Sequence, residues 1–389
     1  MSLLPQHLAA FHHESRFRRW RESLSLFILI LMGIVAARLF WRLAAPRMDF
    51  YNELWGPAYL LVHGQSPYDT ASLAPVLPAA WFPMAIGFFF PLGWLGESAG
   101  LRAWFLFNIT ELCAMIYLVQ GAERSPSRTL AFGFLCFFFP PAINHLMLGQ
   151  ISVTVVLCVI VAARLLESNR LWPAAVFMAL ALSKPHLAFL PMLGLTVDLF
   201  RRAGRTAALV WTGRVAAAAA ALTLPLFVAE PAWIPDALTS MTRNPYWLYP
   251  SLFIVYRRFA PGWEFLLWGI TLAAVTWAVL AAFKNLPRRN AVAWSLALAL
   301  LASPYVGSWD FVLLLPLLFV TLCDSDWRGW LFVSTCYVLA WAGMALVQIQ
   351  PGSDNHFFWW VPVWFVAVAW LATNWKSDRR GHPRPALKP

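Results

Sequence analysis

The feature that most limits the fold of this chain is a series of long apolar segments with few charges inside them. One runs from about Leu24 to Leu43 and another from about Leu101 to Gln120. A helix of roughly 20 apolar residues is long enough to cross the ~30 Å hydrocarbon core of a bilayer. Only 12% of the 389 residues are charged, whereas soluble proteins carry roughly 25%. The sequence therefore predicts an all-α, polytopic membrane protein.

The positions of arginine and lysine predict how the helices are oriented, because basic residues gather on the cytoplasmic side of a membrane. We expect about 12 spans, within a range of about 11–13, with both termini cytoplasmic at an inner or plasma membrane. The first apolar segment is too long for a cleaved signal peptide. We divide the chain into a basic N-terminal segment (1–23), one membrane domain (24–375) and a basic, disordered tail (376–389). Whether residues 81–95 cross the membrane or are re-entrant is left open.

On this topology, residues 44–80 form the first extracytoplasmic loop, which is unusually rich in acids and aromatic residues. Short interfacial helices would suit it. A helix would place Asp49 and Glu53, four residues apart, on one face. Aromatic neighbours such as Tyr51 would partly desolvate Asp49 and raise its pKa toward the range of a general base. The alternative is an interfacial acid that caps a short helix.

Three polar turns between apolar segments are expected on the same side of the membrane as this loop. They contain Asn144 and Gln150, Lys184 and His186, and Tyr305 and Asp310. Amide groups can hold sugar hydroxyls or phosphate oxygens, and the isolated Lys184 needs an anionic partner such as a phosphate. Each turn also has a structural alternative. These are an interhelical hydrogen bond for Gln150, snorkelling of Lys184 to the interface, and a plain turn with interface aromatics at Tyr305.

The order of these motifs resembles that of glycosyltransferase family 87, the polyprenyl-phosphate-mannose-dependent mannosyltransferase-like proteins of the GT-C membrane fold. The matching segments are Asp49-Phe50, Gly64–Asp69, the apolar run Trp81–Leu95, Asn144–Gln150, the turn at Ser183–His186, and Ser303–Asp310. The chain departs from the family pattern in having Trp81-Phe82-Pro83 where Tyr-Pro-Pro is common. It also has Tyr305 where a histidine is common, and His186 and Tyr305 are the two candidates for that role.

The resemblance implies a GT-C type bundle and a hexosyltransferase, such as a mannosyltransferase, that uses a polyprenyl-phosphate sugar donor. The acceptor would be a lipid or glycan on the extracytoplasmic face, with inversion at the anomeric carbon. Asp49 would deprotonate the acceptor hydroxyl, and the region of Lys184 and His186, with Arg243 or Arg257, would bind the lipid phosphate. Substrate contacts are expected from Glu53, Tyr51, Gln150, Asn144, Lys184, His186, Arg243, Tyr305 and Asp310.

Other classes of function find less support in the residues. The chain has no glycine-rich nucleotide loop and no HExxH or CxxC motif, and the net charge of +11 fits cytoplasmic loops better than a nucleic-acid partner. We predict no cofactor, because the lipid-linked sugar is a substrate. We assume no metal, because the first loop lacks an obvious ligand cluster, and metal dependence is left open. The competing hypothesis is a transporter or flippase for a polyprenyl-linked or other amphiphilic substrate, which needs no base. The sequence does not determine the sugar, acceptor, polyprenol length or oligomeric state.

Overall fold

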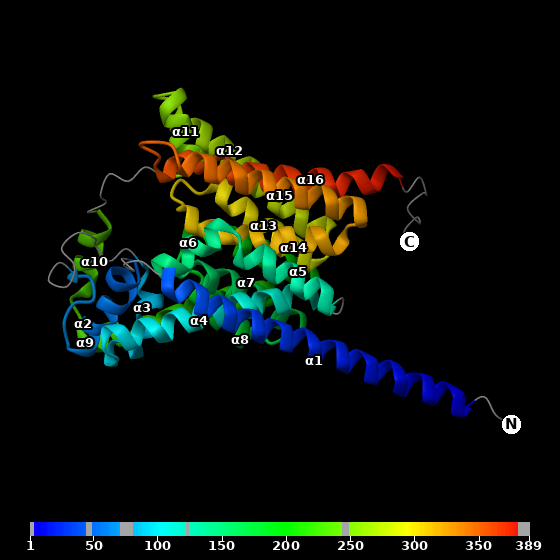
Figure 1. Cartoon of the computed structure of the whole chain (residues 1–389). Helices are drawn as coiled ribbons and strands as arrows, with labels where there is room; N and C mark the ends of the chain where they lie inside the picture. Colours follow the sequence, from blue (N-terminus) through cyan, green and yellow to red (C-terminus); the bar gives the residue numbers. More distant parts are fainter. Residues whose placement is uncertain (1–3, 44–48, 71–80, 122–123, 243–248, 380–389) are drawn as a thin grey trace.

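A computed structural model of the chain describes residues 4–43, 49–70, 81–121, 124–242 and 249–379. Within these residues the regular elements are all helical (Figure 1). The helices are α1 (Leu4–Leu43), η1 (Phe50–Trp55), α2 (Gly56–Val62), α3 (Pro83–Phe89), η3 (Phe90–Trp94), α4 (Glu97–Gln120), α5 (Pro126–Phe137), α6 (Pro140–Leu148), α7 (Ser152–Glu167), α8 (Leu171–Ala181), α9 (Pro185–Ala229), α10 (Trp233–Thr242), α11 (Leu252–Phe259), α12 (Glu264–Asn285), α13 (Arg288–Ala302), η5 (Ser308–Leu314), α14 (Leu315–Asp324), α15 (Trp327–Gln348), η6 (Asn355–Phe358) and α16 (Trp360–Arg379).

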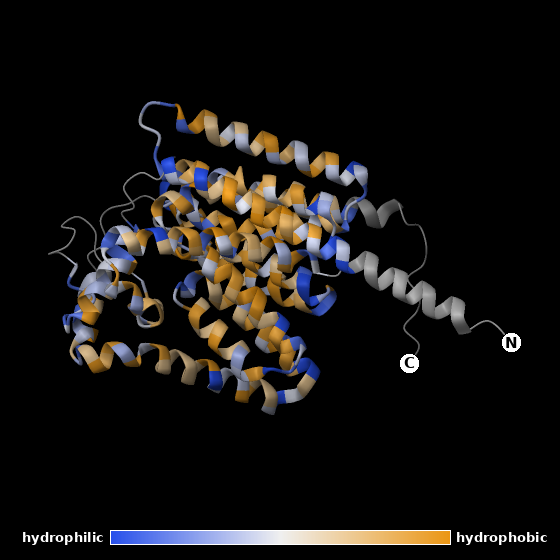
Figure 2. Cartoon of the chain, turned by 60° about the horizontal axis from the view of Figure 1, so that its bottom comes forward, coloured by the Kyte–Doolittle hydropathy of each residue, from blue (hydrophilic) through white to orange (hydrophobic). Residues whose placement is uncertain are grey.

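Six of the described helices are long and apolar enough to cross a membrane, and a seventh span results if α5 and α6 count as one. Figure 2 shows apolar residues along the bodies of the helices, with hydrophilic residues concentrated near their ends. Large apolar side chains on the outer surface, such as Trp277 and Val228, are more than 70% exposed. A soluble protein rarely exposes apolar surface on this scale. The finding supports a membrane-embedded chain, and the predicted number of about 12 spans stays a prediction.

Two helix boundaries differ from the sequence prediction for local reasons. The segment expected as one helix near 129–143 is bent by 62° between α5 and α6. Pro140 and Pro141 lack backbone donors, and proline forces the preceding Phe139 into extended backbone. Conversely, the helices expected at 186–200 and 207–228 are joined in α9, which is kinked where Gly204 adopts a φ of 83°.

At both ends of the described chain, a helix is longer than the sequence predicts. α1 begins at Leu4 rather than near Leu24, and its first part reaches beyond the bundle in Figure 1. α16 continues to Arg379, into the segment expected to be a tail. The rest of that predicted disordered tail, residues 380–389, lies outside the described residues.

The first loop folds as a helical unit packed onto the bundle. The sequence predicts a short helix over Asp49–Leu61, and η1 and α2 together cover Phe50–Val62. Much of this unit is buried against the rest of the protein. Gly93 permits the contact with η3, because a Cβ there would lie 2.2 Å from the Ala58 carbonyl oxygen. The Trp55 indole also donates to the Leu95 carbonyl oxygen at 3.1 Å. The loop is therefore held in one position over the end of α4.

Several helix breaks meet at the same end of the bundle as η1. α6 ends at Gly149, whose φ of 72° favours glycine. The next breaks lie between α8 and α9, and between α13 and η5, and elements on both sides of them pack against α7. Polar side chains can face one another at these breaks, because the unwound turns free them from the apolar helix surfaces. The three polar turns of the sequence prediction lie at these breaks.

Candidate active site

The centre of the polar cluster is a buried ion pair between Lys184 and Asp310. Lys184 Nζ lies 2.9 Å from Asp310 Oδ1, and the two residues are 5% and 0% exposed. Asp310 also accepts from the Ser152 hydroxyl at 2.5 Å and the Gly307 backbone N–H at 2.8 Å. These contacts fix the carboxylate in η5 and leave it without exposure to water. Lys184 thus has an anionic partner within the protein itself.

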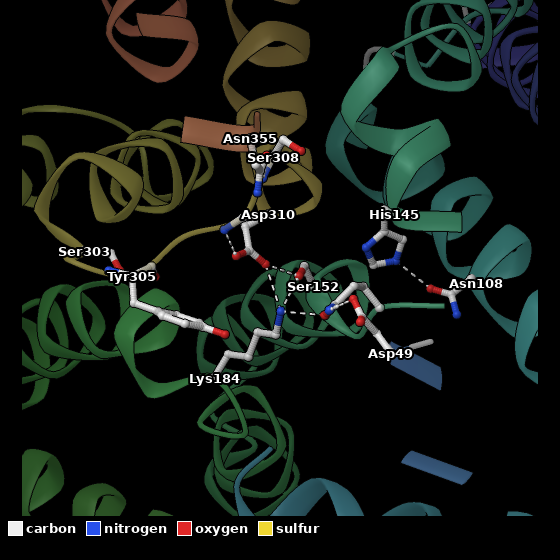
Figure 3. A network of polar contacts seen from close by, with 12 residues as sticks. Asp49, Asn108, His145, Ser152, Lys184, Ser303, Tyr305, Ser308, Asp310 and Asn355 are labelled. Atoms are coloured by element: carbon white, nitrogen blue, oxygen red, sulfur yellow. Dashed lines mark hydrogen bonds and ion pairs between the residues drawn. The ribbon is translucent and has the colours of Figure 1, made fainter. Parts of the chain in front are cut away.

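Gln150 connects this ion pair to the first loop. Lys184 Nζ donates to Gln150 Oε1 at 2.7 Å, and Gln150 Nε2 donates to Asp49 Oδ2 at 2.5 Å (Figure 3). An ammonium group has donors only, so the amide oxygen must face Lys184. The amide nitrogen must then face Asp49, where it can only donate. The result is a continuous chain of polar contacts from Asp310 through Lys184 and Gln150 to Asp49.

Gly149 makes the connection between Gln150 and Asp49 sterically possible. A Cβ on Gly149 would lie 2.6 Å from the Cβ of Phe50, the residue after Asp49. The Gly149 carbonyl oxygen accepts from the Trp104 indole at 2.8 Å, and the Trp104 and Phe50 rings stack. η1 and the turn after α6 therefore approach each other as closely as a glycine allows.

Two carboxylates of η1 share this environment. Asp49 and Glu53 are each 5% exposed, and the π-helical turns of η1 keep their charges within mutual reach. Burial raises the pKa of Asp49 to about 6, although the Gln150 donor and Lys184 lower it. Burial, and next the charge of Asp49, raises the pKa of Glu53 well above its usual value. Burial and the neighbouring charge therefore favour the protonated form of Glu53, whereas Asp49, with a pKa of about 6, is mostly ionised at neutral pH.

An aromatic group lies on the other side of Lys184. The His186 ring stands edge-on to the Tyr305 ring at 5.4 Å between centroids, and Tyr305 contacts Tyr249 at 4.1 Å. The His186 Nε2 atom and the Glu53 Oε2 atom are buried without a hydrogen-bond partner in the described part of the chain. Buried polar atoms are rarely left unpaired. These two atoms are therefore candidates for contact with a bound molecule.

The remaining predicted residues lie at the edge of this cluster or outside it. Asn144 donates to the Ser308 hydroxyl at 3.0 Å, which ties α6 to η5. Tyr51 is half-buried and packs against Trp55 at 5.2 Å between ring centroids. Arg243 lies outside the described residues. The structure thus brings Asp49, Glu53, Gln150, Lys184, His186, Tyr305 and Asp310 into one neighbourhood.

Two polar features near this site were not predicted from the sequence. Ser152 donates to Asp310 and accepts from Lys184 at 3.1 Å, but as the first residue of α7 it had no distinguishing signal. Asn108 lies within an apolar span, and its Oδ1 accepts a hydrogen bond from Nε2 of the buried His145 ring at 2.7 Å. A polar residue within an apolar span is expensive and was itself a usable signal. No metal-binding group of three His, Cys, Asp or Glu side chains occurs among the residues that the structure describes.

Comparison with known proteins identifies the family of this chain. No curated protein matches it. A family model described as glycosyltransferase family 87 matches residues 81–304, a range that includes Gln150 and Lys184 but not Asp49 or Asp310. The match covers more than half of the sequence, and the chain therefore belongs to glycosyltransferase family 87.

Proposed function

We propose that this protein is an inverting membrane hexosyltransferase, such as a mannosyltransferase, with Asp49 as the general base. The donor is a polyprenyl-phosphate sugar, and the acceptor is a lipid or glycan on the extracytoplasmic face of a cell inner or plasma membrane. The chain would form a GT-C type bundle with both termini cytoplasmic. The observation that carries the proposal is the chain of contacts from Asp310 to Asp49, which fixes a buried carboxylate at the site.

Asp49 has the protonation behaviour that a base for this reaction requires. In an inverting transfer, the acceptor hydroxyl attacks the anomeric carbon from the face opposite the phosphate. The new carbon–oxygen bond forms as the bond to phosphate breaks, and the bonding electrons leave with the phosphate. The hydroxyl proton passes to Asp49, whose pKa of about 6 lies close to neutral pH, where general bases are most effective.

Gln150 is well placed to direct Asp49 toward the acceptor. Its amide occupies Oδ2 of Asp49, so Oδ1 is the atom that would accept the proton. Burial beside Asp49 favours the protonated form of Glu53, which would offer a donor to a sugar or acceptor oxygen. This division of roles between two neighbouring carboxyl groups follows from their different environments.

The phosphate is better matched to His186 and Tyr305 than to a direct contact with Lys184. All three ammonium hydrogens of Lys184 are engaged, by Gln150, Ser152 and Asp310. A phosphate would have to replace one of them, whereas His186 Nε2 has no partner among the described residues. We therefore assign Lys184 mainly to fixing Gln150 and to stabilising developing charge through its field.

The direct test is sugar transfer by purified protein in lipid nanodiscs, with radiolabelled polyprenyl-phosphate sugars and a membrane lipid extract as acceptor. We expect product with one member of a panel of donor sugars, and almost none with Asp49→Asn. The matched control is Asp69→Asn, which changes an exposed carboxylate of the same loop and should retain activity. Movement of the donor across the membrane without a covalent product, unchanged in Asp49→Asn, would instead indicate a transporter or flippase.

A further inference from the structure

A cavity lined by several arginines lies at the opposite ends of the helices that form the candidate active site. It has a volume of about 390 Å³. Ser152 begins α7 in the active site, and Arg164 lines this cavity 12 residues further along, which corresponds to about 18 Å of helix. α4 and α13 likewise have one end at the candidate active site and the other end at this cavity. The cavity is therefore separate from the catalytic cluster.

Three arginines line the cavity, against a single carboxylate, that of Glu167. Arg164 is half-buried, and its guanidinium donates to the Leu118 carbonyl oxygen. Arg289 Nη2 lies 2.9 Å from Asp324, a pair that is partly exposed to solvent and therefore weak. The positive charges of Arg124 and Arg289 both act on Arg164, and the carboxylate of Glu167 opposes them.

The charge of Arg288 is compensated within the protein, and its side chain is held rigidly at the edge of the cavity. It is 7% exposed, and its Nε and Nη2 atoms donate to Asp198 Oδ2 at 2.9 and 2.6 Å. Nη1 donates to the Ala163 carbonyl oxygen at 3.3 Å. A guanidinium fixed in this way keeps its orientation when a ligand binds, so it offers its remaining N–H donors in fixed positions.

We propose that this cavity binds a phosphate group, carried either by a membrane lipid or by a soluble polyphosphate. Arginine pairs well with phosphate, because its planar fork can donate two parallel hydrogen bonds. The other lining residues are mostly apolar and suit the chain of a lipid; they include Val119, Ile160, Val292, Pro316 and Val320. The proposal does not depend on sugar transfer, since no active-site residue takes part.

The test uses the full-length protein and two probes that separate the sources of phosphate. Inorganic pyrophosphate is titrated into the detergent-purified protein, and its Kd is measured from the shift in Tm. In parallel, nanodiscs containing phosphatidylglycerol are compared with nanodiscs of phosphatidylcholine alone, with Tm and lipid retention in native mass spectrometry as readouts. A response to pyrophosphate indicates a soluble ligand, and a response to phosphatidylglycerol alone indicates a lipid headgroup; either supports the site.

Three variants locate the response in this cavity. Arg164→Gln should weaken binding by about tenfold or more, because it removes a charge-assisted donor. Glu167→Gln should strengthen binding, because it removes the carboxylate that lines the cavity. Arg170→Gln, at an exposed position close by in the chain, should change nothing. The proposal is overturned if neither probe acts, or if all three variants respond like the wild type. The opposite sign expected for Glu167→Gln keeps the test decisive even if Arg164→Gln folds poorly.

Discussion

Replacing Asp49 with asparagine should separate the catalytic role of this residue from its effect on stability. The variant keeps the shape of the side chain and an oxygen for the Gln150 donor, but it removes the base. General bases typically accelerate reactions by about 10²–10⁴-fold. We therefore expect kcat/KM to fall by about that factor, while the protein folds normally.

The pKa of Asp49 also gives the size of the stability change. Folding raises it from 3.8 to about 6, so the folded state binds the proton more tightly than the unfolded state. The contribution of protonated Asp49 to the free energy of unfolding is therefore complete below about pH 4 and is lost as the pH rises through about 6. The whole effect is about 3 kcal/mol at 1.36 kcal/mol per pKa unit. About 1.4 kcal/mol of it falls between pH 5 and pH 7.5.

The assay compares unfolding of Asp49→Asn and wild type in the same detergent at pH 5 and pH 7.5, so that titrating groups that do not interact with Asp49 cancel. The variant should gain about 1.4 kcal/mol relative to wild type between the two pH values. In parallel, the wild-type kcat/KM should rise with pH and level off above about pH 6. An Asp49→Asn variant that keeps its activity would refute the assignment of the base. A stability difference that is independent of pH would refute the desolvation of Asp49.

Three further substitutions test the surroundings of Asp49. Gln150→Leu removes the donor that lowers the pKa of Asp49, so the inflection of the kcat/KM profile should move to higher pH; an unmoved inflection would contradict the contact. Lys184→Met leaves Asp310 as an unpaired buried charge and should cost about 3–5 kcal/mol in unfolding free energy. The double variant Lys184→Met/Asp310→Asn should lose less than the sum of the single changes. Gly149→Ala should cost at least about 1 kcal/mol through its positive φ and should lower kcat by displacing η1, whereas Gly96→Ala, where a Cβ meets open space, should retain kcat.

The sequence was sufficient to predict the class of fold and which turns share one side of the molecule. Apolar length and charge bias are local signals, and they led to the helical, membrane-embedded chain. They also placed Lys184 among residues that needed an anionic partner. That this partner is Asp310, 126 residues away, could not follow from spacing, because it depends on how α9 and η5 pack.

Predictions about single residues failed for the same reason, because the partners of those residues depend on how distant segments pack. Ser152 and Gly149 look like ordinary turn residues until the approach of η1 gives them partners. The bend between α5 and α6 was signalled by Pro140 and Pro141, but its size depends on the neighbours. For Asp49, the local sequence pattern favoured a helix cap over a catalytic role. In the structure no side-chain cap bond starts η1 at Asp49, and the carboxylate turns to Gln150 instead.

Charge balance within the active site leads to a final prediction about the donor. Asp49 and Asp310 share one cation, Lys184, and burial favours the protonated form of Glu53. With Asp49 ionised, the free site therefore carries an excess of negative charge, and burial disfavours that charge and raises the pKa of Asp49. A polyprenyl-phosphate sugar adds a further negative charge, so its binding should make Asp49 more basic just before the proton is transferred. The pH profile of kcat, which reports the substrate complex, should then have its inflection at higher pH than that of kcat/KM, which reports the free enzyme. Coincident inflections would show that the phosphate binds too far from Asp49 for its charge to act there.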